Sequence, residues 1–280
     1  MPVVIRLKND TDLNERIEKA RQTKQERLYF DAERAITELP PTIVTLSDLV
    51  AFSFTHGNLR RWPSNTPSLS ALTDLSLAYN RLKSLPPQIG QLSALTGFDV
   101  RGNELTSLPR ELFNNTTLTR LNAGENKLST LPPDIGKLTA LTALDVRLNE
   151  LRELPNEVCC LTALTYFQVS YCDLTVLPKD IGNLTELTDF NLHSNRLRSL
   201  PRSVRRWTKM AHLYLSGNRF ESFPDALAEI APDAVVYVDG NVACKEVMER
   251  QRETLHKRAV NRLALLLSNT HRQGPSPNSN

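Results

Sequence analysis

The chain has 280 residues and a formal net charge of +3, and 40% of its residues are hydrophobic and 23% charged. This composition supports a folded core and excludes a disordered chain, and so small a net charge does not indicate nucleic-acid binding. No uncharged apolar run reaches the roughly 20 residues of a membrane-spanning helix, so we expect no integral membrane association.

Residues 1–14 mix charged and apolar residues and lack the apolar run of a signal peptide. The four cysteines, Cys159, Cys160, Cys172 and Cys244, are not arranged as pairs that bracket the chain, so they do not predict a disulfide framework. We therefore expect a soluble protein of the reducing cytoplasm.

The first predicted element is an amphipathic helix within residues 1–27, which would cap the N-terminal end of the core. Asp10 and Thr11 are candidate N-cap residues, and apolar residues recur after them at helical spacing. These apolar residues are Leu13, Ile17 and Ala20. A first strand is predicted at 28–30.

A 23-residue repeat organises residues 28–241. Nine prolines mark it without any insertion: Pro40, Pro63, Pro86, Pro109, Pro132, Pro155, Pro178, Pro201 and Pro224. One unit reads Leu141-x-x-Leu144-x-Val146-x-x-Asn149-x-Leu151-x-x-Leu154-Pro155. This is the leucine-rich repeat pattern.

The apolar–x–apolar pair of each unit predicts a short strand with one buried face. One such strand cannot bury its face alone, so neighbouring units must stack. We therefore predict an α/β fold, a leucine-rich repeat solenoid: a curved right-handed coil with a parallel sheet on its concave face and short helical turns on its convex side. The repeat proline is expected at the first helical position of each turn, and Gly90, Gly136 and Gly182 where a turn ends.

One position of the unit holds asparagine in most repeats, and its amide can satisfy backbone groups that the turn after the strand leaves unpaired. This predicted asparagine ladder comprises Asn80, Asn103, Asn126, Asn149, Asn195 and Asn218, with Asn241 as its last member. Gly57 and Cys172 occupy this position in two units. We interpret Cys172 as a small buried substitute, with a redox-sensitive thiol as the alternative.

At the C-terminal end, Val235, Val236 and Val238 predict a last strand, and residues 242–268 a capping helix that gives the solenoid helical caps at both ends. From Lys245 onward the chain has seven Lys or Arg and three Glu, so contact with an acidic lipid surface or a calmodulin-like partner is the alternative for this helix. Residues rich in Pro, Ser and Asn at 269–280 predict a disordered tail.

Variable positions beside the buried strand residues are expected to face outward on the inner curve. The candidate partner-binding residues are Tyr79, Asp99, Arg101, Arg120, Glu125, Asp145, Arg147, Tyr166, Tyr171, Asp189, His193, His212 and Tyr214. Tyr and Arg often dominate protein–protein binding energy, and Tyr166, Tyr171 and Tyr214 predict an exposed aromatic patch. We therefore expect a monomer that binds a protein partner on this face, and no nucleic acid.

Motifs for catalysis are missing from the sequence: it has no phosphate-binding G-x-x-x-x-G-K loop, no C-x-x-C pair and no H-E-x-x-H helix. His193 and His212 lie near Asp189, but their offset repeat positions are a poor geometry for a metal or for acid–base work. We therefore expect neither an enzyme nor a cofactor or metal site.

The unit Leu131-Pro132-Pro133-Asp134-Ile135-Gly136-Lys137-Leu138 resembles the intracellular Ras-group leucine-rich repeat proteins, the family of Ras suppressor protein. The resemblance covers about residues 13–245, and it implies a non-catalytic adaptor acting around small GTPase pathways or adhesion assemblies. Two other roles stay open: a scaffold that regulates a phosphatase, and an effector or substrate receptor of a ubiquitin ligase.

Overall fold

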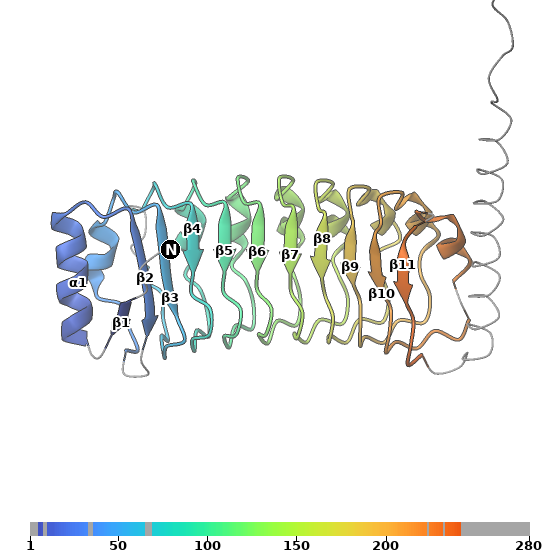
Figure 1. The fold of residues 1–280 in the computed structure, drawn as a ribbon, viewed down its shortest axis with the longest axis horizontal. Helices are drawn as coiled ribbons and strands as arrows, with labels where there is room; N and C mark the ends of the chain where they lie inside the picture. The colour runs from blue at the N-terminus through green and yellow to red at the C-terminus, as the bar shows by residue number, and fades with distance from the viewer. Residues whose placement is uncertain are drawn as a thin grey trace, which may run out of the picture.

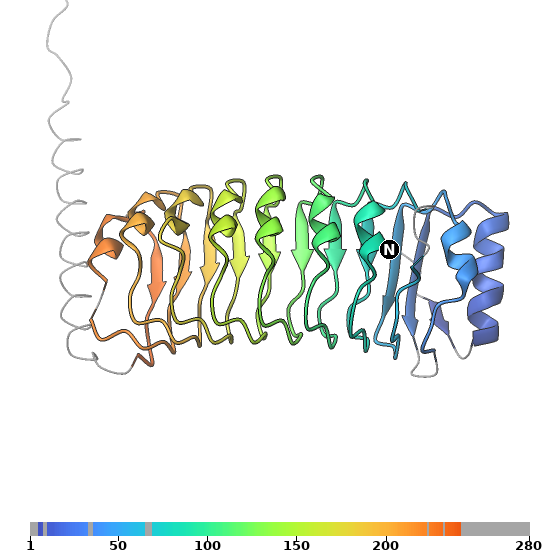
Figure 2. The same ribbon diagram turned by 180° about the vertical axis from the view of Figure 1, so that it is seen from behind.

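The computed structural model describes residues 5–7, 10–32, 36–64, 69–222, 224–231 and 233–241. These residues form an elongated solenoid with its strands on one face and its short helical turns on the opposite face (Figures 1 and 2). The helix and the tail predicted at 242–268 and 269–280 lie outside the described residues.

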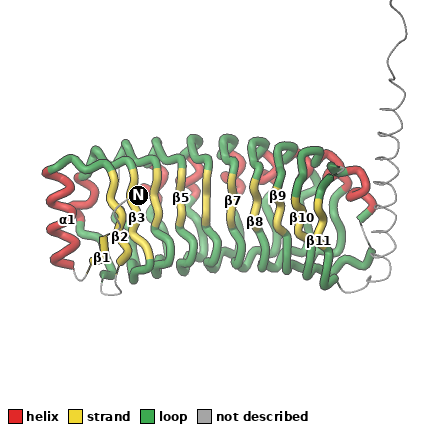
Figure 3. The backbone as a smooth tube through the Cα atoms, viewed as in Figure 1, coloured by secondary structure: helices red, strands yellow, loops and turns green. Residues whose placement is uncertain are grey.

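The strands form a single eleven-stranded sheet in which every strand pairs in parallel with its sequence neighbour. They are β1 Ile5–Leu7, β2 Arg27–Ala32, β3 Ala51–Thr55, β4 Asp74–Ser76, β5 Gly97–Asp99, β6 Arg120–Asn122, β7 Ala143–Asp145, β8 Tyr166–Gln168, β9 Asp189–Asn191, β10 His212–Tyr214 and β11 Val235–Tyr237. Figure 3 shows them side by side along the whole solenoid. The predicted leucine-rich repeat solenoid is confirmed.

The N-terminal end is closed by helix α1, Asp10–Gln22, which packs beside the first coil (Figure 1). Leu13, Ile17 and Ala20 are at most 1% exposed, which agrees with the predicted amphipathic pattern. Asp10 and Thr11, expected as caps, are instead the first two helical residues. Strand β1 precedes the helix and pairs with β2, and no sequence pattern predicted it.

In the part of the chain that the structure describes, the turns on the other face include eight 3₁₀ helices, one for most coils. They are η1 Pro41–Thr45, η2 Pro87–Gln91, η3 Arg110–Asn114, η4 Pro133–Lys137, η5 Asn156–Cys160, η6 Ile181–Asn183, η7 Arg202–Arg206 and η8 Asp225–Glu229. The repeat proline precedes the helical turn in extended conformation, as at Pro155, and does not occupy the first helical position. Its carbonyl accepts the first hydrogen bond of the turn, here from Val158 N at 3.1 Å, so the proline is positioned by its oxygen as well as by its fixed φ.

Three glycines lie inside these turns and not at their ends, contrary to the prediction. Gly90, Gly136 and Gly182 do not have positive φ; a side chain is excluded there because the next coil comes too close. A Cβ at Gly182 would collide with the carbonyl oxygen of Ser203 in the following coil. The glycines recur every 46 residues, and η2 with η3 and η4 with η5 pack more extensively than η3 with η4 or η5 with η6, whereas η7 packs equally against η6 and η8.

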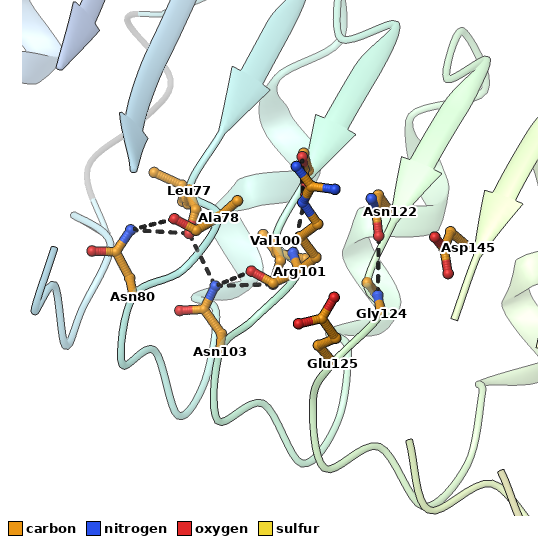
Figure 4. A network of polar contacts seen from close by, with 12 residues as sticks. Leu77, Ala78, Asn80, Val100, Arg101, Asn103, Asn122, Gly124, Glu125 and Asp145 are labelled. Carbon is orange, nitrogen blue, oxygen red and sulfur yellow. Dashed lines mark hydrogen bonds and ion pairs between the residues drawn. The ribbon is translucent and has the colours of Figure 1, made fainter. Parts of the chain in front are cut away.

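The asparagine ladder joins each coil to the one before it (Figure 4). The Asn103 Oδ1 accepts the N–H of Leu82 at 2.9 Å, and its Nδ2 donates to Leu77 O and Val100 O, both at 2.9 Å. Equivalent bonds are made by the other predicted members, Asn80, Asn126, Asn149, Asn195, Asn218 and Asn241. Each amide therefore satisfies buried backbone groups of two coils.

Cys172 replaces one of these amides with weaker contacts. Its Sγ lies 3.6 Å from Val146 O and 3.7 Å from Ser170 O. Burial raises the pKa of the Cys172 thiol to about 11, so the side chain stays protonated at neutral pH. Because the thiolate is the reactive form, this favours the interpretation as a buried substitute over a redox-sensitive thiol.

The residue before each ladder position has a left-handed backbone, a feature not predicted from the sequence. Its φ lies between 52° and 72° at His56, Tyr79, Gly102, Glu125, Leu148, Tyr171, Ser194, Gly217 and Gly240. The chain therefore turns at this position in each of these nine coils, and whichever side chain occupies it projects from a turn rather than from a strand.

Candidate binding face on the exposed side of the sheet

The exposed side of the sheet, here called the strand face, is built by the alternation of side chains along each strand. In β6, Leu121 is buried in the core while Arg120 and Asn122 on either side of it point outward. The pairing register places the equivalent residues of all strands in rows that run across the sheet.

The predicted partner-binding residues divide into three sets along each coil. Those on the strands are Asp99, Arg120, Asp145, Tyr166, Asp189, His212 and Tyr214. Those two residues beyond a strand end are Arg101, Arg147 and His193, and those on the left-handed turn are Tyr79, Glu125 and Tyr171. The structure thus brings the first two sets together on the strand face and places the third along its edge.

A hollow of about 720 Å³ lies on the strand face between β2 and β8. Small residues in every second strand make room for it: Ala51, Gly97 and Ala143 share one row. Its charged lining residues are Arg27, Asp74, Asp99, Arg101, Arg120, Asp145 and Arg147. Sequence reasoning missed Arg27 and the small residues, which aligning the strand rows across repeats could have revealed.

An ion pair crosses the hollow above β5. The Nη2 of Arg120 lies 2.7 Å from Asp74 Oδ1, two strands away. A Cβ at Gly97 would lie 2.7 Å from both of these atoms, so the pair depends on the glycine between them. Both side chains are at least half exposed, and such pairs add little stability, so a ligand can replace this one at small cost.

Two aspartates that line the hollow each accept a hydrogen bond from the backbone. The Oδ1 of Asp99 and that of Asp145 accept the N–H of Arg101 and of Arg147, each at 3.1 Å. Asn122 accepts the N–H of Gly124 in the same way (Figure 4). Burial raises the pKa of both Asp99 and Asp145, and it outweighs the adjacent guanidinium groups.

Replacing Asp145 by asparagine should raise the stability of the protein at pH 7, because Asn122 shows that an amide makes the same turn contact. A raised carboxyl pKa in the folded state contributes stability that is lost as the pH rises through that pKa, and asparagine does not ionise. Urea denaturation should therefore show D145N more stable than wild type at pH 7, with the difference closing under acidic conditions in which Asp145 is protonated. A D145N protein that is less stable at pH 7 would mean that the Arg147 ion pair outweighs burial.

The C-terminal end of the strand face is aromatic. The rings of Tyr214 and Tyr237 stack in parallel with centroids 4.6 Å apart, and Tyr166 is 38% exposed. The Nδ1 of His212 lies 3.0 Å from Asp189 Oδ1. Burial is the largest cause of a raised pKa at Tyr214, with Tyr237, Asp189 and Tyr166 adding to it.

Tyr171 does not join this patch, contrary to the prediction. It lies on the left-handed turn five residues after Tyr166, where its hydroxyl is 3.2 Å from His193 Nε2. Tyr237, which was not among the predicted residues, joins Tyr166 and Tyr214 instead of Tyr171. Its position one repeat after Tyr214 could have identified it from the sequence.

Within the described parts of the chain, no three His, Cys, Asp or Glu side chains gather to hold a metal ion. Over the same residues, no helix has the length and apolar character needed to cross a membrane.

No family model and no curated protein matches the chain. Among solved structures, a leucine-rich repeat protein of Leptospira interrogans is 26% identical with a TM-score of 0.71 over 87% of this chain and 66% of that one. A plant peptide hormone receptor, RGFR1 in complex with RGF2, is 23% identical with a TM-score of 0.71 over 81% of this chain and 42% of the receptor. A TLR13–ssRNA13 complex is 20% identical with a TM-score of 0.69 over 84% and 35%.

The chain thus spans less than two thirds of each of these structures. The similarities identify the fold and do not distinguish the Ras group from other leucine-rich repeat proteins. By repeat pattern, sheet topology and structural similarity, the chain has a leucine-rich repeat fold.

Proposed function

We propose that the chain is a non-catalytic scaffold that holds a protein partner on its strand face. The observation that carries this proposal is the hollow between β2 and β8, where four arginines converge around small residues. One of their nitrogens, Arg101 Nε, is buried and makes no hydrogen bond among the described residues; it lies 3.6 Å from Asp99 Oδ2.

The charge of the strand face favours protein over nucleic acid. Its outward positions on β2–β11 and the adjoining turns hold Asp31, Asp74, Asp99, Glu125, Asp145, Asp189 and Asp239 against Arg27, Arg101, Arg120 and Arg147. A phosphate backbone is bound by an excess of Lys and Arg, which this face lacks.

Within this scaffold role, we propose intracellular signalling around a small GTPase, a phosphatase or an adhesion-complex component, with the protein as a cytoplasmic monomer. The support is the resemblance of residues 13–245 to the Ras-group proteins. A purified small GTPase that binds in only one of its GDP- and GTP-loaded forms would support the signalling role; equal binding of both forms, or none, would argue against it.

The scaffold proposal is tested by affinity capture followed by binding measurements with the purified captured protein. Replacing Arg101, Arg120 and Arg147 together by alanine should weaken binding by at least about tenfold, because hot-spot arginines contribute about 2 kcal/mol or more. The matched control replaces three exposed arginines away from the strand face, Arg152, Arg202 and Arg205, and should bind like wild type. Equal affinities of both triple variants, with unchanged melting temperatures, would refute the proposal.

A further inference from the structure

The strand face over β8–β11 combines aromatic rings with negative charge. Its outward positions hold Asp189 and Asp239 and no Lys or Arg. Three tyrosines lie there, here called the tyrosine patch: Tyr166, Tyr214 and Tyr237. Asp189 is paired in register with Tyr166 of β8, and Tyr214 lies on the neighbouring strand β10. Neighbouring strands are about 4.8 Å apart, so the carboxylate of Asp189 is within side-chain reach of both rings.

The chain contains a counterpart of Asp189 that already binds an arginine. Asp74 occupies the same row five repeats earlier, and in both places the preceding threonine donates its hydroxyl to Oδ2, at 2.9 Å from Thr73 and 2.8 Å from Thr188. The Oδ1 of Asp74 is occupied by the guanidinium of Arg120 at 2.7 Å. The Oδ1 of Asp189 is 3.0 Å from an imidazole nitrogen instead.

The chain also contains a tyrosine whose ring already binds an arginine. The guanidinium carbon of Arg101 lies 5.1 Å from the centroid of the Tyr79 ring. Among the residues that the structure describes, no Lys or Arg is placed in this way on a ring of the tyrosine patch. Tyr166 and Tyr237 nevertheless keep 38% of their surface exposed, beside Val235 at 45%. The patch thus offers both kinds of arginine contact seen in the first half, without an arginine of its own.

We propose that the tyrosine patch takes an arginine or lysine side chain from a basic segment of the partner, seated on the tyrosine rings beside Asp189. The electron-rich ring faces attract a cation, and the carboxylate supplies the hydrogen-bond acceptor. The inference rests on the proposed scaffold function and names the chemistry of the partner at one end of the strand face.

The test uses a capped peptide, Ac-Gly-Arg-Gly-Arg-Gly-NH₂, and a twin in which citrulline replaces both arginines and so removes the charge while keeping the size and planar shape of the side chain. Titrated into the full chain and followed by NMR, the arginine peptide should shift signals of the tyrosine patch. The citrulline peptide should bind on the order of threefold to tenfold more weakly, as expected for loss of a cation–π contact and its charge.

Asp189→Asn keeps a side chain of the same shape. It should lower the affinity for the arginine peptide to that for the citrulline peptide. Asp180→Asn is the control: it removes an exposed carboxylate beside η6 on the helical face and should leave the affinity unchanged. Tyr166→Leu should also weaken binding, while Tyr79→Leu should not. Circular dichroism and melting temperature confirm that each variant is folded.

Equal binding of both peptides, no binding of either, or an unchanged affinity in D189N would overturn the inference. Displacement of the peptide by a short single-stranded RNA would also overturn the inference, because it would show that the tyrosine rings stack on bases. The two proposals can be distinguished. If the Arg101/Arg120/Arg147 variant loses the captured partner but D189N binds it normally, the scaffold function stands and this inference does not.

Discussion

Replacing Asn149 by alanine should lower the free energy of unfolding by about 1–3 kcal/mol, the cost of leaving one buried backbone N–H without a partner. The Oδ1 of Asn149 accepts the N–H of Leu128 at 2.8 Å, and its Nδ2 donates to Ala123 O at 3.0 Å and Val146 O at 2.9 Å. Alanine leaves the Leu128 N–H without a partner in the middle of the stack, whereas Ala123 O still accepts from Asn126 Nδ2 at 3.1 Å and Val146 O keeps only the long contact to Cys172 Sγ at 3.6 Å. Urea denaturation followed by circular dichroism measures the loss.

Two variants serve as controls for this result. Asn156→Ala removes an exposed asparagine from η5 and should change stability by less than about 0.5 kcal/mol. Cys172→Asn should act in the opposite direction and stabilise the protein, because it provides an amide where the thiol makes only long contacts. A loss below about 1 kcal/mol for Asn149→Ala would show that the amide bonds do not hold the coils together.

Replacing Gly182 by alanine should lower the free energy of unfolding by about 2–4 kcal/mol, a large effect for one methyl group. The new Cβ would overlap the carbonyl oxygen of Ser203, and the backbone of one coil would have to move. Gly136→Ala should cost less, because its nearest contacts, at 2.9 Å and 3.0 Å, are the carbonyl oxygen and Cβ of Glu157. Thermal and urea unfolding of both variants give the comparison.

Arg205→Ala is the matched control for the glycine series, because Arg205 occupies the same repeat position on an exposed part of η7. It should change stability by less than about 0.5 kcal/mol. If Gly182→Ala is as stable as wild type, the approach of Ser203 to Gly182 does not constrain the packing of η6 against η7.

Much of the fold could be predicted because the repeat leaves little freedom. Once Leu144 and Val146 are assigned to the buried side of the sheet, the residues 23 positions before and after them must be buried as well. Strand β1 escaped prediction because it has only three residues and stands before the first repeat. The close approach of successive turns at the glycines escaped it because only the three-dimensional structure shows what Gly90 approaches in the next coil.

The candidate site could be predicted only in part. Alternation along the strands identified Arg120 and Tyr166 as outward-facing. It could not reveal that one oxygen of Asp99 serves a turn, that Gly97 lets an ion pair cross two strands, or that Tyr171 has a left-handed backbone. These depend on contacts between coils and on backbone angles, which the repeat pattern leaves undetermined.

The central claim is that the strand face is one docking surface, and hydroxyl-radical footprinting of the purified complex with the captured partner tests it most directly. Tyrosine and cysteine side chains react readily, and the chain places reporters on both faces: Tyr29, Tyr166 and Tyr237 on the strand face, and exposed Cys160 on η5. We predict that the partner protects the three tyrosines and leaves Cys160 as reactive as in the free protein. Protection of Cys160 with undiminished labelling of the tyrosines would contradict the account.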